Sequence, residues 1–166
     1  MHSRIIQLTE RKLYSDEYIE ESDFMGYDDS ISNYILGADY VDSTDDRKGD
    51  IEWFKNYLCD DLGLKEYVEL NLGEEEEFIT FKQGFKTAFF QYFFDNFNKL
   101  TQEIDLEKFS TYSSELCKLQ QIIDPNHGFR ICSEEKAEMM SLHDFVRYLT
   151  DEETVLYIGG VLDYHY

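Results

Sequence analysis

Histidine and cysteine side chains are the most reactive groups in this sequence, and their spacing does not define a familiar type of site. The histidines lack an HxxxH or HExxH pair: His2, His127, His143 and His165. The cysteines lack the CxxC spacing of a zinc site: Cys59, Cys117 and Cys132. His127 and Cys132 share one turn-to-strand stretch, which a cysteine–histidine hydrolase could in principle use. His127 lies in a Pro-Asn-His-Gly turn, however, and no oxyanion motif accompanies it, so a hydrolase is the least favoured class.

Two short segments resemble ligand-binding loops only superficially. Counting a calcium loop from Asp42 places Arg47 where glycine is required and Trp53 where a bidentate glutamate is required. Gly159-Gly160 follows an apolar run, yet no helix start follows it, and a phosphate loop needs one. Carboxylate pairs that could do acid–base work occur throughout a chain with 36 acids, so they identify no site. We therefore expect no metal ion and no cofactor.

Charge is the strongest signal in the sequence. The 166 residues include 36 acidic side chains against 15 Lys and Arg, a net charge of −21. Such a surface repels nucleic acids and anionic membranes and attracts basic protein surfaces, which argues against direct nucleic-acid binding. Solubility needs a net charge of only about 2–8. An AT-rich coding bias would enrich Lys as readily as Glu, so the excess of acids favours a binding role.

The acids are concentrated in the segment Tyr14–Asp50, which holds twelve of them against Arg47 and Lys48. Aromatic residues interrupt this segment, so we expect it to lie on the domain as an ordered loop or edge strand. A second acidic run is Glu74–Glu77. If the two segments adjoin on one surface, they form a face for a basic partner. Its predicted members are Asp16, Glu17, Glu20, Glu21, Asp23, Asp28, Asp29, Asp39, Asp42, Asp45, Asp46, Asp50, Glu74, Glu75, Glu76 and Glu77.

The hydrophobic pattern predicts strands near both ends of the chain, at Arg4–Thr9 and Val155–Tyr166. In the second of these, Gly159-Gly160 marks a bulge or a close backbone approach. Three further strands are expected, at Ser32–Val41, Glu66–Leu72 and Phe129–Ser133, and Phe78–Phe81 is either a short strand or a helix entry. Helices are expected from a start at Ser43-Thr44-Asp45-Asp46, where cap candidates precede acids of the first turn, and over 83–104, 106–123 and 141–149. The first of them has an apolar stripe, formed by Ile51, Phe54, Leu58 and Leu62.

Strands near both termini and helices between them favour an α+β class over a βαβ alternation. We predict one domain, 1–166, with a short mixed or antiparallel sheet formed with the terminal strands. The sheet is expected to pack on a central aromatic-rich helix pair. The first helix of that pair has seven rings between Phe85 and Phe97, which cover most of its circumference. Core packing is the default interpretation of these rings; a ligand pocket or a homodimer seam is the alternative.

Nothing in the sequence predicts export or membrane insertion. The first twelve residues lack the apolar core of a signal peptide. The longest apolar runs, Ala88–Phe94 and Val155–Leu162, are far shorter than a membrane span. An odd number of scattered cysteines is typical of reduced thiols. We therefore expect a cytoplasmic protein with no membrane partner.

Both ends of the chain resemble those of other proteins. The opening Met1-His2-Ser3-Arg4-Ile5 and the closing run Leu156–Tyr166 resemble the ends of uncharacterised acidic proteins of Gram-positive bacteria and their mobile elements. The resemblance covers about a tenth of the chain and implies no activity. Proteins of phages and mobile elements that inhibit restriction or CRISPR enzymes often imitate DNA with spaced carboxylates, and small size and high negative charge suit that class.

The favoured hypothesis is a non-enzymatic, acidic protein-binding domain that imitates a nucleic acid and inhibits a DNA- or RNA-processing enzyme. Binding would be steered by charge and weakened by salt. The alternative is an accessory or structural protein that docks through aromatic surface, with acidity serving solubility only. A small hydrolase comes last.

Overall fold

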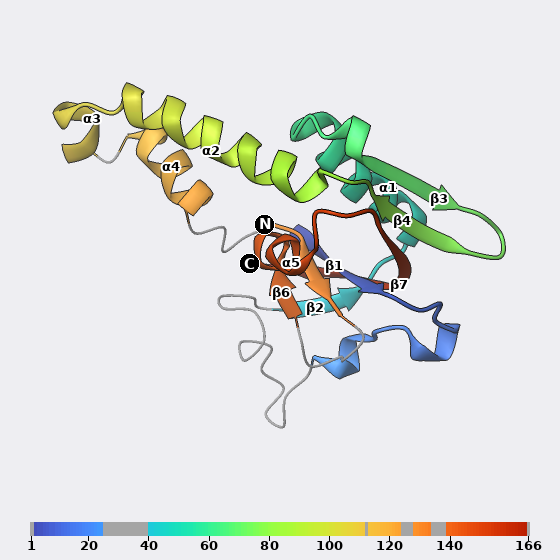
Figure 1. Cartoon of the computed structure of the whole chain (residues 1–166). Helices are drawn as coiled ribbons and strands as arrows, with labels where there is room; N and C mark the ends of the chain where they lie inside the picture. The colour runs from blue at the N-terminus through green and yellow to red at the C-terminus, as the bar shows by residue number, and fades with distance from the viewer. Residues whose placement is uncertain (1, 25–39, 112, 124–127, 134–138, 166) are drawn as a thin grey trace.

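The computed structural model describes residues 2–24, 40–111, 113–123, 128–133 and 139–165. Among these residues, seven strands form a single sheet (Figure 1). The order along the sheet is β3-β4-β7-β1-β5-β6, and β2 pairs with β7. The strands are β1 (His2–Thr9), β2 (Tyr40–Ser43), β3 (Val68–Leu72), β4 (Glu77–Phe81), β5 (Arg130–Cys132), β6 (Met139–Ser141) and β7 (Thr154–His165).

Five α-helices and four shorter helical turns lie within the described residues. The α-helices are α1 (Arg47–Asn56), α2 (Phe85–Glu103), α3 (Leu106–Ser110), α4 (Ser114–Ile123) and α5 (Leu142–Tyr148). The turns are η1 (Ser15–Glu17), η2 (Glu21–Asp23), η4 (Tyr57–Asp61) and η5 (Lys65–Tyr67). The predicted helix start at Ser141 is confirmed, since its side chain accepts a hydrogen bond from the Asp144 N–H. The first helix begins at the end of the predicted run Ser43–Asp46, where the Asp46 side chain accepts a hydrogen bond from the Gly49 N–H.

Strand β7 is the centre of the sheet. It pairs antiparallel with the whole of β1, from His2 opposite His165 to Thr9 opposite Tyr157. Its other edge pairs with β4 over 154–157 and with β2 over 162–165. Strand β1 pairs with β5 in parallel, so the sheet is mixed. The predicted mixed α+β class, with strands from both ends of the chain in one sheet, is confirmed.

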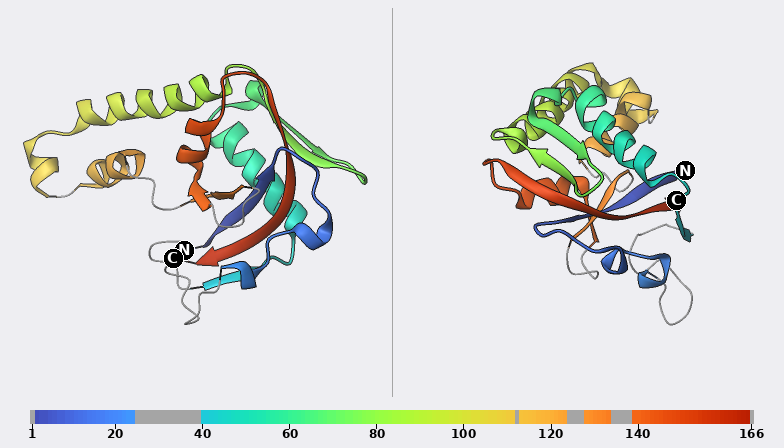
Figure 2. Two further views of the ribbon diagram at one scale, coloured as in Figure 1. Left: turned by 60° about the horizontal axis from the view of Figure 1, so that its bottom comes forward. Right: turned by 90° about the vertical axis from the view of Figure 1, so that its right-hand side faces the viewer.

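Each face of the sheet has its own cluster of buried side chains, because neighbouring residues of a strand point to opposite faces. Ile6 and Leu8 pack with the predicted helical stripe of α1 and η4, with α5 and with the first turns of α2. Ile5 and Tyr164 pack on the opposite face with Ile19 and Phe24, which follow β1 in the chain. The helices therefore cover one face, and the segment 10–24 covers the other (Figure 2).

We predicted that the sheet packs on the aromatic-rich helix pair, and only the beginning of the first of these helices does so. Among the described residues of α2, Phe85 and Phe89 are buried, and α4 has no buried residue. The predicted helix over 106–123 is two helices, since Asp105 caps α3 and α3 ends at Ser110. Helix α2 continues past the sheet and pairs with α4 there, so only its first turns reach the core (Figure 1).

The predicted strand Ser32–Val41 lies mostly outside the described residues. Its last two positions, Tyr40 and Val41, belong to β2.

Candidate protein-binding surface

The acidic segment that follows β1 is attached to the sheet by one polar side chain, Gln7. Gln7 is buried, and its Oε1 accepts hydrogen bonds from the Ile19 N–H (3.0 Å) and the Gly160 N–H (2.9 Å). Its Nε2 donates to the Glu17 carbonyl (3.2 Å). One amide thus satisfies backbone groups of both the segment and β7, and so orders the first acids of the predicted binding segment.

The glycine pair of β7 allows the segment to lie this close. A Cβ added to Gly160 would stand 2.7 Å from the Ile19 carbonyl oxygen and 2.8 Å from its nitrogen. Backbone atoms cannot yield as the end of a side chain can, so only glycine fits at this position. The predicted close backbone approach at Gly159-Gly160 is confirmed.

Arg47, in the first turn of α1, links the second acidic segment to the same region. Its guanidinium donates to the carbonyls of Gly159 (2.7 and 2.9 Å) and Ile158 (3.0 Å). It also forms an ion pair with Glu77 at the start of β4 and lies 5.0 Å from the centre of the Tyr18 ring. Arg47 therefore holds together α1, β7, the β3–β4 turn and the segment after β1.

These contacts enclose a half-open pocket of about 270 Å³. It is lined by Lys12, Leu13, Tyr18, Arg47, Lys48, Gly73, Glu74, Glu75, Glu76, Glu77, Tyr157 and Ile158. The segment after β1 and the Glu74–Glu77 turn therefore adjoin, and the acids that line the pocket itself are those of the turn. The pocket also contains cations: Lys12 Nζ is 3.7 Å from Glu76, and Lys48 Nζ is 4.0 Å from Glu77.

The predicted partner-binding residues differ in exposure. Eight are exposed: Asp16, Glu20, Asp42, Asp45, Asp46, Glu74, Glu75 and Glu76. Four are half-buried: Glu17, Glu21, Asp23 and Glu77. Three lie outside the described residues: Asp28, Asp29 and Asp39. We use the name acidic face for two sets of exposed acids: Glu74, Glu75 and Glu76, which line the pocket, and Asp16, Asp45 and Asp46, which are within two residues of the lining residues Tyr18 and Arg47 in the sequence.

Two of the half-buried predicted residues already bind cations of the same chain. Glu17 accepts a hydrogen bond from Arg11 (2.7 Å), which, with the Tyr14 N–H, lowers the pKa of the Glu17 carboxyl. Glu77 pairs with Arg47. Both carboxylates therefore support the path of the chain, and the exposed acids beside them are the ones that a partner can reach.

Asp50 is a correction to the predicted surface, because only 8% of it is exposed. It lies one turn into α1, on the side that faces the sheet, where Oδ1 is 2.8 Å from Arg4 Nε and Oδ2 accepts a hydrogen bond from Thr44. Arg4 also contacts Asp163 (2.6 Å), which is 2.9 Å from His2 Nδ1. A buried carboxylate needs such partners, so Asp50 belongs to an internal network that joins β1, α1 and β7.

Among the described residues, neither Cys132 nor Cys59 is placed as a reactive thiol. His127 lies outside the described residues, and Cys132 is fully buried in β5. Burial raises the pKa of the Cys59 thiol, which disfavours the reactive thiolate. Within the described part of the chain, no three His, Cys, Asp or Glu side chains are grouped so that they could hold a metal ion.

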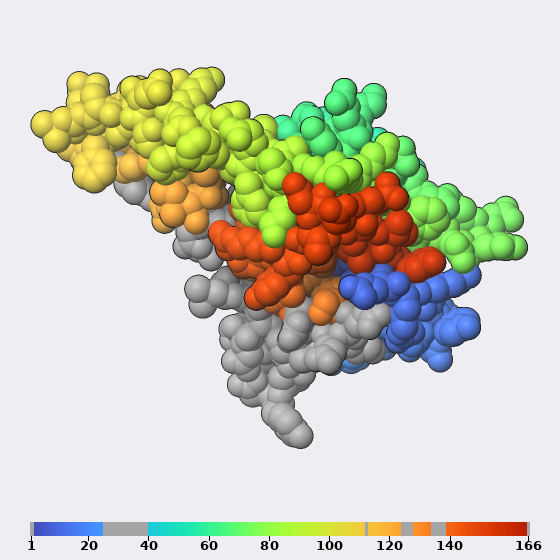
Figure 3. Space-filling view, in the orientation of Figure 1, coloured from blue at the N-terminus to red at the C-terminus, as the bar shows by residue number. Residues whose placement is uncertain are grey.

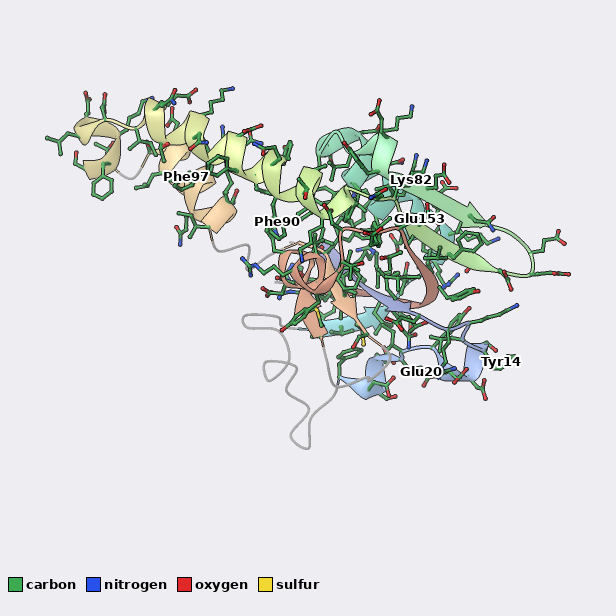
Figure 4. All side chains as sticks on the ribbon, viewed as in Figure 1. Tyr14, Glu20, Lys82, Phe90, Phe97 and Glu153 are labelled. Carbon is green, nitrogen blue, oxygen red and sulfur yellow. The ribbon has the colours of Figure 1, made fainter. Side chains whose placement is uncertain are left out.

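A second surface feature, the arm, consists of α2, α3 and α4 and extends away from the rest of the molecule (Figure 3). It exposes large apolar side chains: Phe94 (59%), Leu106 (83%), Phe109 (63%) and Ile123 (63%). Beside the base of the arm is an open hollow of about 570 Å³, lined by Lys86, Thr87, Phe90, Gln91, Phe94 and Asp151. In Figure 4, Phe90 and Phe97 lie along the arm, while Tyr14 and Glu20 lie on the far side of the sheet.

Comparison with known proteins found no relative of this chain. No protein-family model, no curated protein and no solved structure matches it. Among the described residues, no helix is both long and apolar enough to cross a membrane.

Sequence reasoning missed the residues that organise this surface, which are Gln7, Arg47 and the pair Arg4–Asp163. Of these residues, only Gln7 could have been found from the sequence, because it is a single amide among the apolar residues Ile5, Ile6 and Leu8 of a predicted strand. A polar residue at a buried strand position needs hydrogen-bond partners, and the glycine pair of β7 is where a neighbouring backbone could come close enough to supply them.

Proposed function

We propose that this protein is a non-enzymatic binding protein whose acidic face docks on a basic protein surface and takes the place of a nucleic acid there. The observation that supports this most directly is the meeting of the segment after β1, the start of α1 and the acidic Glu74–Glu77 turn around one pocket. Gln7 and Arg47 hold those parts in place before any partner arrives, so binding has little ordering cost to offset.

The negative charge of the protein acts on a partner at distances beyond direct contact. A net charge of −21 steers a basic partner toward the molecule and repels nucleic acid. Asp16, Asp45, Glu74 and Glu75 form no ion pair within the described residues, so their charge is available to a partner. The groove of a nucleic-acid enzyme is lined with Lys and Arg, and carboxylates can occupy it as phosphates do.

The test is a competition experiment with the purified protein as bait for a host lysate, washed at 50 and 300 mM salt and read by mass spectrometry. The expected result is recovery of a nucleic-acid enzyme that salt elutes and that added duplex DNA displaces. The purified enzyme is then titrated with the intact protein and with a variant carrying Asp16→Asn, Asp45→Asn, Glu74→Gln and Glu75→Gln. We expect at least tenfold weaker binding of the variant, because each substitution removes one interfacial charge.

A matched control separates the face from the overall charge. Glu103→Gln, Glu107→Gln, Glu152→Gln and Glu153→Gln also remove four exposed acids, but these lie on the arm and in the loop before β7. The control variant should bind nearly as well as the intact protein. Equal weakening in both variants would mean that net charge alone drives the interaction, and a partner indifferent to salt and DNA would end the mimicry proposal.

A second candidate function is docking through aromatic surface, with the acids serving solubility. The exposed Phe94, Leu106 and Phe109 of the arm favour it. Binding of this kind would be insensitive to salt and lost on Phe94→Gln. Binding through the acidic face would instead be weakened by salt and unchanged by Phe94→Gln.

A further inference from the structure

The start of β1 and the end of β7 bring together two histidines from opposite ends of the sequence (Figure 2). His2 and His165 are directly opposite each other in the antiparallel pairing of the two strands, so their side chains lie on the same face of the sheet. The centres of their imidazole rings are 5.0 Å apart. No short-range histidine motif could indicate this pair, because only the pairing of β1 with β7 brings the two residues together.

The carboxylate of Asp163 fixes the orientation of His2. Its Oδ2 is 2.9 Å from His2 Nδ1. An ionised carboxylate only accepts hydrogen bonds, so Nδ1 is the donor, and Nε2 of the neutral ring carries the lone pair. Metal-binding histidines have this arrangement, in which the ring nitrogen that does not bind the metal donates to a carboxylate. The other oxygen of Asp163 is 2.6 Å from Arg4, so the carboxylate is itself held in place.

Tyr40, on the neighbouring strand β2, restrains His165. It is opposite His165 in the pairing of β2 with β7, and the two rings are stacked, with their centres 5.3 Å apart and their planes 6° from parallel. The Tyr40 ring also lies 6.2 Å from the ring of His2. Both histidines therefore have defined places before a ligand arrives, which reduces the ordering cost of binding.

We infer that His2 and His165 together bind one divalent transition-metal ion, Zn²⁺ in the first place, through one nitrogen of each ring. Two imidazoles that bind one ion at Zn–N distances of about 2.0–2.1 Å have ring centres roughly 4.5–5.5 Å apart, a range that includes the separation of this pair. Among the described residues no group of three His, Cys, Asp or Glu ligands is present, so water fills the remaining positions on the ion.

The surroundings of the pair favour a cation, and the ligand type selects which one. Arg4 is shared by Asp50 and Asp163, so its positive charge is more than offset. The His2 side chain is 55% exposed, which leaves the pair accessible from solvent. A net charge of −21 raises the local concentration of every cation. Imidazole nitrogen suits zinc, copper and nickel, whereas magnesium and calcium prefer oxygen ligands, so Mg²⁺ should not compete for this site.

The site is independent of the proposed function. It lies at the end of β7, whereas the pocket beside the acidic face is lined by Tyr157 and Ile158, near the beginning of that strand. Neither histidine belongs to the acidic face.

Isothermal titration calorimetry with ZnCl₂ tests the inference, in a buffer whose 5 mM MgCl₂ occupies adventitious carboxylate sites. We expect one ion per chain and at least about tenfold weaker binding by His2→Gln and, separately, by His165→Gln, since each variant keeps a single imidazole. Asp163→Asn keeps both ligands but removes the orienting carboxylate, and should weaken binding about tenfold. The controls Cys117→Ser, which removes a half-buried thiol, and His127→Gln should bind Zn²⁺ as the intact protein does.

Two further measurements need no variant. In the imidazole ¹H–¹⁵N NMR spectrum, Zn²⁺ should shift the signals of two histidines and leave the others in place. The melting temperature should rise by roughly 5–10 °C at a free Zn²⁺ concentration a hundredfold above the Kd, because the ion binds only the folded chain. Binding that survives both histidine variants, or that Cys117→Ser abolishes, overturns the inference. So does the absence of saturable Zn²⁺ binding in the presence of MgCl₂.

Discussion

Gln7 shows how much of this surface depends on single side chains. Its amide makes three hydrogen bonds to backbone groups, two of them to N–H groups of Ile19 and Gly160 that are buried with it. Arg47, in α1, likewise makes three hydrogen bonds to backbone groups, all of them to carbonyls of β7. The acids on the surface take their positions from these two interior contacts.

Replacing Gln7 by Leu tests that dependence. The variant keeps the volume but leaves two buried N–H groups unsatisfied, at about 1–3 kcal/mol each. We therefore expect the free energy of unfolding, measured by urea titration, to fall by about 2–5 kcal/mol, with faster amide exchange over 15–24. Gln83→Leu, at an exposed position, is the control and should change stability by less than about 0.5 kcal/mol. An unchanged urea midpoint in the Gln7→Leu variant would contradict this account of the segment.

His143 makes a second residue-scale prediction, on pH. It lies against Phe89 and Phe93 of α2, and burial, with the nearby positive charge of Arg147, lowers its pKa to about 4. The nearby Asp144 acts in the opposite direction and is the weaker influence. The folded state therefore holds His143 neutral, while the unfolded chain takes up a proton near its usual pKa of about 6.5.

The resulting stability is fully present above pH 6.5 and is lost as the pH falls toward 4. Lowering the pH from 7 to 5 should therefore reduce the free energy of unfolding by about 2 kcal/mol through this group. His143→Gln removes the titration, so the change in stability between these two pH values should be smaller in the variant by about that amount. Urea titrations of both proteins at pH 5, 6 and 7 measure it, and parallel pH profiles would show that burial of His143 is not coupled to its protonation.

At the scale of elements, the structure separates helices that belong to the core from helices that do not. Ile51, Phe54 and Leu58 of α1 and η4 are buried under the sheet. Helices α3 and α4 contribute no buried residue, and α2 buries Phe85 and Phe89 alone among its described residues. Most helical stability comes from burying an apolar face, so α3 and α4 have little to hold them in a monomer.

Hydrogen exchange checks this difference. At 1 μM protein, we expect amide protection factors in α3 and α4 at least about a hundredfold lower than in α1 and β7, since these helices can open without disturbing the core. Equal protection of α1 and α4 in the dilute sample would contradict the assignment of the arm to the surface.

On the scale of the whole molecule, a net charge of −21 destabilises the folded state, although the same charge attracts a basic partner. Like charges in a compact domain repel one another, and the unfolded chain relieves part of that repulsion. Salt screens it. The internal network of Arg4 with Asp50 and Asp163 is partly sheltered from solvent, so salt weakens it less than it weakens the repulsion between exposed acids.

We therefore expect the melting temperature to rise by at least about 3 °C between 20 and 500 mM NaCl, equivalent to about 1 kcal/mol for a domain of this size. Differential scanning calorimetry at low protein concentration measures it. The variant with four acids of the acidic face neutralised should show a smaller rise. A melting temperature that is constant or falls with salt would mean that attractive ion pairs outweigh the repulsion.

The sequence by itself determined the elements that local patterns encode. Alternation predicted the terminal strands, and the 3–4 residue spacing of Ile51, Phe54 and Leu58 predicted the buried side of a helix. Ser141 marked one helix start, and the run Ser43–Asp46 marked another to within a few residues. Gly159-Gly160 indicated a close backbone approach, because glycine alone tolerates one. The net charge, and its concentration in two segments, could also be counted directly.

Only the tertiary structure decided which of these residues meet and which reach the surface. Asp50 and Asp45 are equivalent in the sequence, yet one is buried against Arg4 and the other is exposed. Phe89 and Phe94 are the same residue type, yet Phe89 lies in the core and Phe94 faces out, because α2 runs past the edge of the sheet. Burial depends on contacts between distant parts of the chain, and local pattern carries no information about where a helix ends relative to the sheet that it covers.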